Sequence, residues 1–266
     1  MERTVGIVIP AFAPEPSQLV HYISALDETI NPDAILVELD EPAPSTIESL
    51  SNSPATVHVA DRRRGKGAAI TVGFEKLDTD ILAFVDADGS TPVSSFEAIL
   101  APVREDSAAL AVGSRRHPDS TVPTHQSRFR RRAGDFFVRV ARIFLPVTLT
   151  DYQCGAKAIR RETWEQIRGS LRSAGFAWDI ELISLVAWAD EPIVEIPIVW
   201  EDQPGSTVPP MQTALAFGRT VYRIWSEGKS RDSRSTRDVK GGSGDSRVPL
   251  IEREDLVSTP VGGEYS

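Results

Sequence analysis

One apolar stretch of this chain ends abruptly at two carboxylates. Residues 81–85 read Ile-Leu-Ala-Phe-Val, and Asp86 and Asp88 follow with one residue between them. A short, continuous apolar run of this kind predicts a strand that is buried on both faces of a parallel sheet. Ligands of open α/β sheets bind at the carboxyl ends of the strands. The sequence therefore predicts that Asp86 and Asp88 lie at a ligand-binding edge.

These two side chains indicate a metal site, although a structural alternative exists. Neighbouring carboxylates provide hard oxygen ligands, which suit Mg²⁺ or Mn²⁺ and, through the ion, a diphosphate. In the alternative, residues 88–92 form a polar turn, and Ser90 or Thr91 caps a helix that begins near Pro92. This stretch alone does not decide between the two interpretations.

Strands and helices are expected to alternate along the chain. Runs rich in β-branched residues predict strands at 4–10, 34–39, 55–59, 80–85, 108–112 and 193–200, and a strand with a turn at 149–159. Helical spacing predicts helices at 18–30, 45–50, 68–77, 97–103, 128–145, 161–167, 178–188 and 209–225. This order is typical of a doubly wound α/β fold, in which helices flank a mostly parallel central sheet. Pro197 favours an edge position for the last strand.

The composition predicts one globular domain and a tail. Of the 266 residues, 41% are hydrophobic, which is enough for a full core over residues 1–227. Small and charged residues dominate afterwards, so we expect a disordered tail rich in Ser, Gly and Arg at 228–266. The net charge of −9 argues against nucleic acid as a nonspecific partner.

We expect a cytoplasmic protein. No stretch approaches the roughly 18 apolar residues that a membrane-spanning helix needs, and the N-terminus enters a strand directly, with no signal peptide. The single cysteine, Cys154, fits a reducing compartment and is expected to be a small buried residue.

Seven stretches resemble, in the same order, the family-2 glycosyltransferases that act on polyprenyl phosphates. They are Val-Ile-Pro10-Ala-Phe, Arg-Gly-Lys-Gly-Ala-Ala69, Phe-Val-Asp86-Ala-Asp88, Gly-Ser-Arg115, Thr-Asp151-Tyr-Gln-Cys-Gly155-Ala-Lys157, Gly-Phe176-Ala-Trp-Asp179-Ile-Glu181-Leu and Glu195-Ile-Pro-Ile-Val-Trp200. The nearest types are dolichyl-phosphate glucosyltransferases and dolichyl-phosphate mannose synthases. The resemblance extends over residues 4–207 and implies an A-type glycosyltransferase fold with a Rossmann-like central sheet.

The resemblance implies a nucleotide-sugar donor and a divalent ion, Mg²⁺ or Mn²⁺. Asp86 and Asp88 take the metal-binding Asp-x-Asp positions, with Ser90 as the available third oxygen. Donor-binding positions are Pro10, Phe12, Glu15, Asp40, Lys66, Asp86 and Asp179. The alternatives are a solvated loop lysine for Lys66 and a helix cap for Asp179.

This chain departs from its relatives at the donor end. Relatives usually carry Asn-Glu after Pro-Ala-Tyr, whereas this chain has Phe12-Ala-Pro-Glu15. Its second predicted strand ends in Asp40-Glu-Pro instead of Asp-Asp-Gly-Ser. The identity of the nucleotide therefore stays open at this point.

A lipid-phosphate acceptor would need a positively charged binding site of its own. Arg115 follows a predicted strand, and Arg131 and Arg132 begin an amphipathic helix in the region where the relatives bind the acceptor phosphate. A solvated helix face is the rival interpretation for residues 128–132. The resemblance makes Asp151 the residue that orients or deprotonates the acceptor, while its alternative is to cap the turn at 153–155.

The implied reaction is an inverting, metal-dependent transfer of a hexose from a nucleotide sugar to dolichyl or polyprenyl phosphate. Asp88 and Asp151 are its catalytic candidates. UDP-glucose is favoured, because the stretch around Asp151 resembles the glucosyl branch. The alternatives are a GDP-mannose-dependent mannose synthase, a transferase for a soluble sugar or protein hydroxyl, and a noncatalytic nucleotide-sugar-binding subunit.

The acceptor also implies contact with a membrane surface. We expect peripheral attachment at the cytoplasmic face of the membrane, through the helices at 128–145 and 211–225. A membrane-embedded partner protein is a further expectation.

Overall fold

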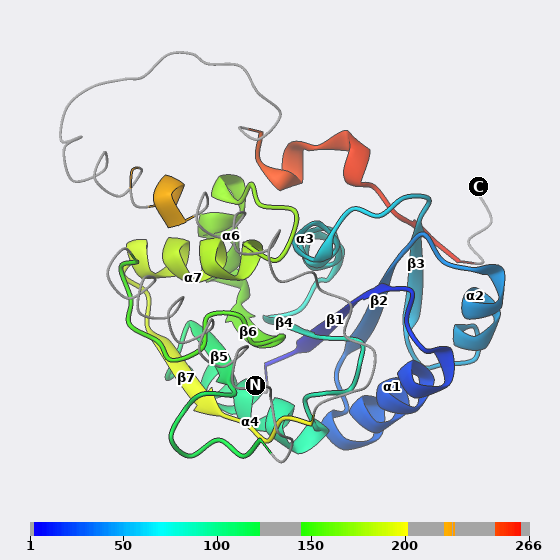
Figure 1. Ribbon diagram of the computed structural model, residues 1–266, viewed down its shortest axis with the longest axis horizontal. Helices are drawn as coiled ribbons and strands as arrows, with labels where there is room; N and C mark the ends of the chain where they lie inside the picture. Colours follow the sequence, from blue (N-terminus) through cyan, green and yellow to red (C-terminus); the bar gives the residue numbers. More distant parts are fainter. Residues whose placement is uncertain (1–2, 123–144, 202–220, 225, 227–247, 262–266) are drawn as a thin grey trace, which may run out of the picture.

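The structure is a computed structural model that describes residues 3–122, 145–201, 221–224, 226 and 248–261. An eight-stranded sheet runs through the molecule in the order β7-β5-β6-β4-β1-β2-β3-β8 (Figure 1). The strands are β1 (Val5–Phe12), β2 (Ala34–Asp40), β3 (Thr56–Ala60), β4 (Ile81–Val85), β5 (Leu110–Ser114), β6 (Ala156–Arg160), β7 (Ile193–Pro197) and β8 (Thr259–Pro260).

The sheet is mostly parallel. Strands β1 to β4 pair in parallel and β7 pairs in parallel with β5, whereas β6 lies antiparallel between β4 and β5, and β8 is antiparallel to β3. The expected doubly wound architecture is confirmed. Strand β7 lies at an edge, as Pro197 indicated, although it ends at that proline and not at Trp200.

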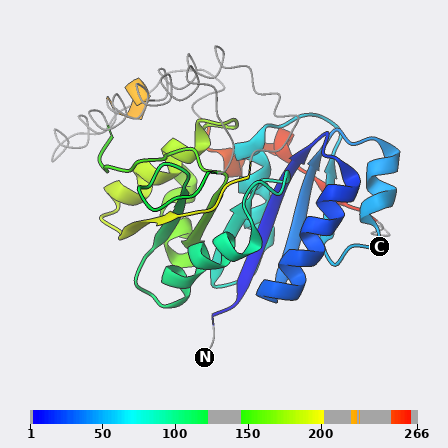
Figure 2. The same cartoon turned by 60° about the horizontal axis from the view of Figure 1, so that its bottom comes forward.

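Helices cover both faces of the sheet (Figure 2). They are α1 (Pro16–Ile30), α2 (Pro44–Leu50), α3 (Lys66–Lys76), α4 (Val93–Arg104), α6 (Arg161–Ile167) and α7 (Trp178–Trp188), with short 3-10 turns η1 (Arg168–Ser170), η3 (Leu250–Glu252) and η4 (Glu254–Leu256). Buried residues of α1 and α4 form the core on one face, and those of α3, α6 and α7 form the core on the other. The result is a three-layer α/β/α arrangement.

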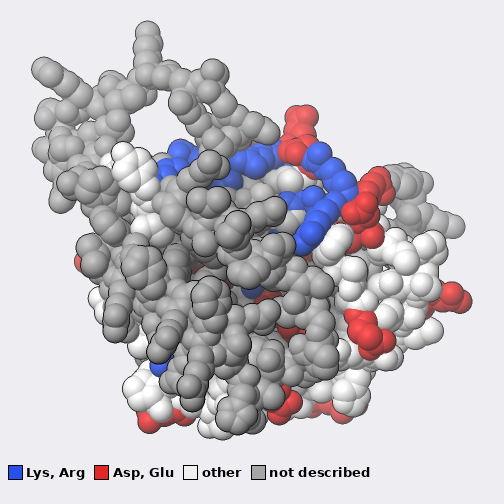
Figure 3. All heavy atoms as spheres, viewed as in Figure 1, with Lys and Arg blue, Asp and Glu red and all other residues white. Residues whose placement is uncertain are grey.

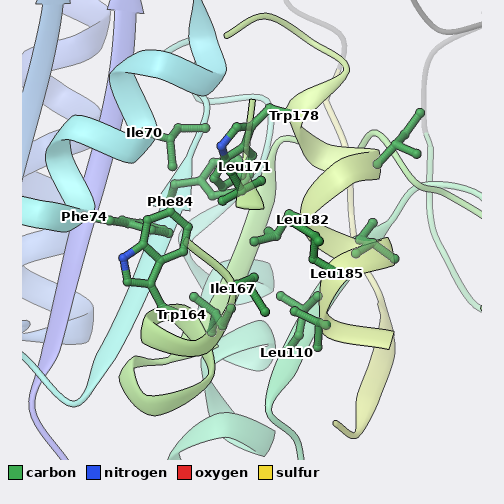
Figure 4. Close-up of a cluster of buried hydrophobic side chains, with 14 of the residues drawn as sticks. Ile70, Phe74, Phe84, Leu110, Trp164, Ile167, Leu171, Trp178, Leu182 and Leu185 are labelled. Atoms are coloured by element: carbon green, nitrogen blue, oxygen red, sulfur yellow. The ribbon is translucent and has the colours of Figure 1, made fainter. Parts of the chain in front are cut away.

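An aromatic cluster fixes α3 and α7 against β4 (Figure 4). The ring of Phe84 on β4 meets Trp178 edge-on, with centroids 5.6 Å apart, and Phe74 meets Trp164 at 5.0 Å. A Cβ atom at Gly67 would lie 2.4 Å from the Cβ of Trp178, so only glycine allows this close approach of the two helices. The strand that carries the two carboxylates is therefore packed firmly from this side.

The segment Val248–Val261 differs from the expected tail. Within it, Leu250 and Leu256 are buried, and β8 pairs with β3 at the edge of the sheet. The sequence did not predict this structure, because the segment has few large apolar residues. A segment that packs onto an existing sheet needs only two or three buried side chains to hold it. The domain boundary at residue 227 remains a prediction, but residues 248–261 belong to the folded part of the chain.

Two expectations about membrane contact fall largely outside the described residues. The helix expected at 128–145 is not described before residue 145, and of the helix expected at 209–225 only residues 221–224 are described, as helix. In the part of the chain that the structure does describe, none of the helices has the length and apolar character to cross a membrane.

Candidate active site

The ends of β4 and β6 hold Asp86 in place. Its backbone N–H donates to the carbonyl of Gly155 at 2.8 Å. A Cβ atom at Gly155 would lie 1.7 Å from Oδ2 of Asp86. The carboxylate thus lies directly over a glycine, and any side chain at residue 155 would displace it.

Asp88 lies in the turn that follows. Gln18 Nε2 donates to the carbonyl of Asp88 at 2.7 Å, and the N–H of Ser90 donates to its Oδ1 at 3.0 Å. Gly89 has a φ of 66°, which favours glycine. Helix α4 begins at Val93 with no side-chain cap, so the interpretation in which Ser90 or Thr91 caps this helix is wrong.

Lys66 lies inside this site and not on a solvated loop. Its Nζ is 2.7 Å from Oδ1 of Asp86 and 3.9 Å from Oδ2 of Asp179. Burial alone would lower the pKa of Lys66, but the two carboxylates outweigh it and raise the pKa. The pKa of Asp86 is raised, chiefly by burial and against the attraction of Lys66. The ammonium group therefore stays charged beside Asp86 at neutral pH.

A second lysine completes this group of charges. Lys157 on β6 is 1% exposed, and its Nζ contacts Oδ1 of Asp179 at 2.5 Å and the carbonyl of Cys154 at 2.7 Å. Asp179, at the start of α7, is itself only 2% exposed. We call Asp86, Lys66, Asp179 and Lys157 the β4 cluster. Sequence reasoning noted the motif that contains Lys157 but missed Lys157 as a site residue. The role of a lysine in a buried strand cannot be predicted before its ion-pair partner is known.

Arg115 and Asp151 form a pair next to β5. The guanidinium group donates from Nε and Nη2 to the two carboxylate oxygens at 2.7 and 3.0 Å. Burial alone would raise the pKa of Asp151, but Arg115 lowers it to about 2. A carboxylate with so low a pKa is a weak general base at neutral pH, so the geometry favours the orienting role of Asp151.

Further contacts fix this pair. Asp151 accepts from the N–H of Gln153 at 3.0 Å, so it also holds the turn that the alternative interpretation assigned to it. Glu195 on β7 accepts from the N–H groups of Thr150 and Asp151. Sequence reasoning missed Glu195 as a functional position, since only the fold brings β7 beside this loop. The backbone and side chain of Asp151 are therefore both restrained.

The predicted donor positions at the end of β1 differ in their surroundings. Phe12 is 44% exposed, and the guanidinium group of Arg63 lies 4.0 Å above its ring, while Pro10 precedes it on the same strand. Glu15 instead caps α1, where it accepts from the N–H of Gln18 at 2.6 Å. Phe12 thus presents an exposed ring at this edge, whereas the carboxylate of Glu15, although exposed, is bound to the start of α1.

Asp40 is buried at the end of β2 and bound by Arg64. Arg64 donates from its backbone N–H and from Nε to Asp40, both at 2.7 Å, and its Nη2 lies 2.8 Å from Oε2 of Glu38. Glu38, Arg64 and Ser258 are buried, and Lys76 reaches Glu38 from the surface. We call these four residues the β2 cluster. Arg64 was missed, because one arginine in a run of three carries no local signal.

Two predicted acceptor residues, Arg131 and Arg132, lie outside the described residues. Of the other predicted positions, the structure brings Lys66, Asp86 and Asp179 into one cluster and joins Arg115 to Asp151. Asp88 adjoins the first group in the turn after β4. Glu15 and Asp40 are engaged in contacts of their own.

The residues after β4 fit a divalent cation. Asp88 is exposed and the side chain of Asp86 is 36% exposed. Among the described residues, the hydrogen bonds and ion pairs of these two carboxylates use only Oδ1 of each, which leaves both Oδ2 atoms for an ion. Ser90 is buried, so its role as a third ligand stays a prediction.

Within the described ranges, no set of three or more His, Cys, Asp or Glu side chains could hold a metal ion. Two carboxylates suit an ion such as Mg²⁺, which usually completes its shell with phosphate oxygens and water.

Solved structures share this fold. Glucosyl-3-phosphoglycerate synthase from Mycobacterium tuberculosis, solved with Mn²⁺, UDP and glucosyl-3-phosphoglycerate, matches 86% of this chain and 80% of its own with a TM-score of 0.61 and 17% identity. Mannosyl-3-phosphoglycerate synthase from Rubrobacter xylanophilus matches 93% of this chain and 80% of its own, with a TM-score of 0.61 and 18% identity. The A-type glycosyltransferase fold is thereby confirmed.

Curated relatives are similar over much of the chain. The glycosyltransferase AglD of Haloferax volcanii is 27% identical over 83% of this chain, which spans only 37% of AglD. The dolichyl-phosphate β-glucosyltransferase of Drosophila melanogaster is 26% identical, over 83% of this chain and 74% of its own. The enzyme of the same name from Saccharomyces cerevisiae is 30% identical, over 54% and 47%. The model of glycosyl transferase family 2 matches residues 7–168, more than half of this chain, which therefore belongs to that family.

Proposed function

We propose that the chain transfers glucose from UDP-glucose to dolichyl or a similar polyprenyl phosphate, with inversion at the anomeric carbon and with a divalent ion. One observation carries the proposal: carboxylates open to solvent and a charged lysine lie at the end of β4, and the charge of Asp86 acts on Arg115, whose pair with Asp151 lies next to β5. The first group suits a nucleoside diphosphate, and the second suits an anionic acceptor. Relatives named dolichyl-phosphate β-glucosyltransferase support the choice of sugar and acceptor.

On the donor side, Asp86 and Asp88 would hold Mg²⁺ or Mn²⁺. When bound, the ion neutralises the charge that develops on the departing diphosphate. Lys66 lies next to Asp86 and adds a fixed positive charge in the same place. Asp179 also attracts that ammonium group, at 3.9 Å, and Lys157 in turn holds Asp179.

On the acceptor side, Arg115 would bind the lipid phosphate. Its side chain is 27% exposed, and Asp151 holds the guanidinium group through two hydrogen bonds. A phosphate monoester with a second pKa near ~6 is largely dianionic at neutral pH, so the nucleophile needs no strong base. This fits the low pKa of Asp151, which orients Arg115 and does not take a proton. A single in-line attack by this dianion on an α-linked donor would give a β-linked product.

The donor nucleotide has a second candidate in GDP-mannose. The relatives favour glucose, and the exposed ring of Phe12 beside Arg63 offers a stacking surface that would suit either base. A noncatalytic nucleotide-sugar-binding subunit is the remaining alternative. The open carboxylates and the Arg115–Asp151 pair speak against it.

The lipid acceptor would bring the protein to a membrane surface. We propose peripheral attachment at the cytoplasmic face, with residues 128–145 and 211–225 as the contacting stretches and a membrane-embedded protein as a further partner. Flotation of the full chain with anionic liposomes tests this part separately.

The test of the reaction is transfer of radiolabelled sugar. The full chain is incubated with polyprenyl phosphate in detergent and Mn²⁺, in separate arms with labelled UDP-glucose and GDP-mannose. We expect lipid-extractable label from UDP-glucose, its loss on chelation, and a β-linked product by anomeric NMR. If only GDP-mannose gave labelled lipid, the enzyme would be a mannosyltransferase and not a glucosyltransferase. Nucleotide binding with no turnover in either arm would leave the noncatalytic alternative.

A further inference from the structure

The C-terminal segment, residues 248–261, lies beside the loop that leads into Lys66, although almost 200 residues separate them in sequence. In Figure 1 it passes above α3 and continues along β3. Leu250 and Leu256 anchor it at 2% and 4% exposure, and His58 and Val59 of β3 pair with β8. It is therefore a fixed part of the donor side of the domain.

The segment contacts the loop at residues 61–65 directly. Arg62 forms an ion pair with Asp255, and Arg64 Nη1 donates to the carbonyl of Leu256 at 3.2 Å. Basic side chains gather in this region of the face shown in Figure 3, with acidic side chains beside them. Since Arg64 also binds Asp40, the segment restrains the residue that joins the loop to the end of β2.

The same segment contacts a second loop on the other flank of α3. The N–H of Leu250 donates to the carbonyl of Leu171 at 2.8 Å, and Arg253 donates to the carbonyl of Arg172 at 3.1 Å. Within that loop, the carbonyl of Ala174 accepts from the N–H of Ala68 in the first turn of α3. Both loops that border the start of α3 thus touch the C-terminal segment.

Ser258 inserts into the β2 cluster. Its hydroxyl donates to Oε2 of Glu38 at 2.7 Å, and Lys76 donates to its carbonyl at 3.1 Å. Glu38 is 0% exposed and its other contacts include Arg64. A continuous path of contacts therefore runs from Ser258 through Glu38 and Arg64 to Asp40 and the loop before Lys66.

We propose that the C-terminal segment is a positioning element for the donor site, with Ser258 as its main positioning residue. Among the described residues, no hydrogen bond or ion pair joins this segment to the carboxylates after β4 or to the Arg115–Asp151 pair. It acts by holding the loop at 61–65, which sets where α3 begins and so where Lys66 meets Asp86. The part that concerns nucleotide affinity rests on the proposed function, whereas the restraint of the loop does not.

Amide hydrogen exchange of the full chain tests the restraint without any ligand. In Ser258→Ala, the loss of a buried polar partner should speed exchange in peptides covering residues 61–66 by about tenfold, with exchange in β4 and α7 unchanged. Val257→Ala is the matched control, because its side chain is 66% exposed in the same segment. Asp255→Asn, a milder surface change, should speed exchange in the same peptides by about threefold. Unchanged exchange at 61–66 in both variants would overturn the proposal.

Calorimetric titration with UDP and Mn²⁺ then tests the consequence for the donor site. Ser258→Ala should weaken UDP binding by about tenfold, while Val257→Ala binds as the parent chain does. In a transfer assay the donor KM should rise and kcat should stay nearly constant, which a general loss of folded protein would not produce. If the parent chain bound neither UDP nor GDP, the proposed function would fail, and the exchange result would still decide the positioning role. Faster exchange with unchanged UDP affinity would refute the link to the donor site.

Discussion

The β2 cluster and the β4 cluster are built from the same kinds of side chain, yet only one has a carboxylate that is open to solvent. In the β2 cluster, Glu38 is fully buried and the C-terminal segment covers it through Ser258. In the β4 cluster, the side chain of Asp86 is 36% exposed and Asp88 follows it on the surface. Charges that are closed off by protein partners serve the fold, whereas charges with free oxygen atoms are available to a ligand.

Removal of one open carboxylate should have the largest effect on activity. Asp86→Asn keeps the shape of the side chain but weakens both the ion site and the contact with Lys66. We expect transfer to fall about 10³-fold, since electrostatic stabilisation of a leaving group is worth several kcal/mol. Initial rates at saturating donor measure it, and the melting temperature separates this loss from any change in folding that follows from the lost contact with Lys66.

Glu48→Gln is the control for that variant, because Glu48 is an exposed carboxylate on α2. It should keep full activity. Equal rates in Asp86→Asn and Glu48→Gln would show that the open carboxylates are not part of the reaction site.

Lys157 and Asp179 are the most buried pair of the β4 cluster. Breaking this pair should lower the stability of the fold. Lys157→Met leaves Asp179 as a buried charge without its 2.5 Å partner, which should cost about 3–5 kcal/mol of unfolding free energy. Lys76→Met is the matched comparison and should cost less, because Glu38 keeps Arg64 and Ser258. Chemical denaturation measures both.

A double variant sharpens this comparison. Lys157→Met with Asp179→Leu removes both charges and should recover much of the loss. Additive losses in the double variant would mean that the two side chains do not act as a pair.

The free energy of unfolding should depend on pH through Glu38 of the β2 cluster. Burial would raise the pKa of Glu38, but His58, Ser258, Lys76 and Arg64 together lower it to about 2. Because the folded pKa lies below the unfolded value of ~4.3, the ionised group stabilises the fold above pH ~4.5. This stability is lost as the pH falls toward 2.

Glu38→Gln removes that titration. The difference in unfolding free energy between the parent chain and Glu38→Gln should therefore shrink by about 2–3 kcal/mol from pH 5 to pH 2. Denaturant titrations at several pH values measure it. A difference that stayed constant over this range would contradict the assigned pairing of Glu38.

The smallest effect is expected at Asp151. Asp151→Asn loses part of the hold on Arg115 but no general base, so transfer should fall by only about tenfold. The pH–rate profile between pH 6 and 9 should keep its shape. Loss of an ionisation from that profile would instead identify Asp151 as the base.

Sequence reasoning located the strand ends but not the partners of the charges. The apolar run before Asp86 and the proline in β7 are local signals, and they predicted a buried strand and an edge strand correctly. Lys157, Arg64 and Glu195 acquire their roles from residues that are distant in sequence. No local pattern distinguishes such residues from ordinary surface charges.

The C-terminal segment is a second case in which contacts between residues distant in sequence could not be predicted. Its composition is that of a disordered tail, yet Leu250 and Leu256 are enough to anchor it on a sheet and helices that other residues have already formed. At Glu15 the local geometry adds a role that sequence reasoning did not predict, because its side chain caps α1. Its contact with the donor stays a prediction.

The most direct test of the central claim is the affinity of UDP for the parent chain and for Asp86→Asn, each with and without Mn²⁺. We predict that UDP binds the parent chain at least about tenfold more tightly with Mn²⁺ than without it, and that Asp86→Asn loses this difference. Equal affinity in all four titrations would contradict the assignment of the β4 strand end as the site of the nucleotide and its ion.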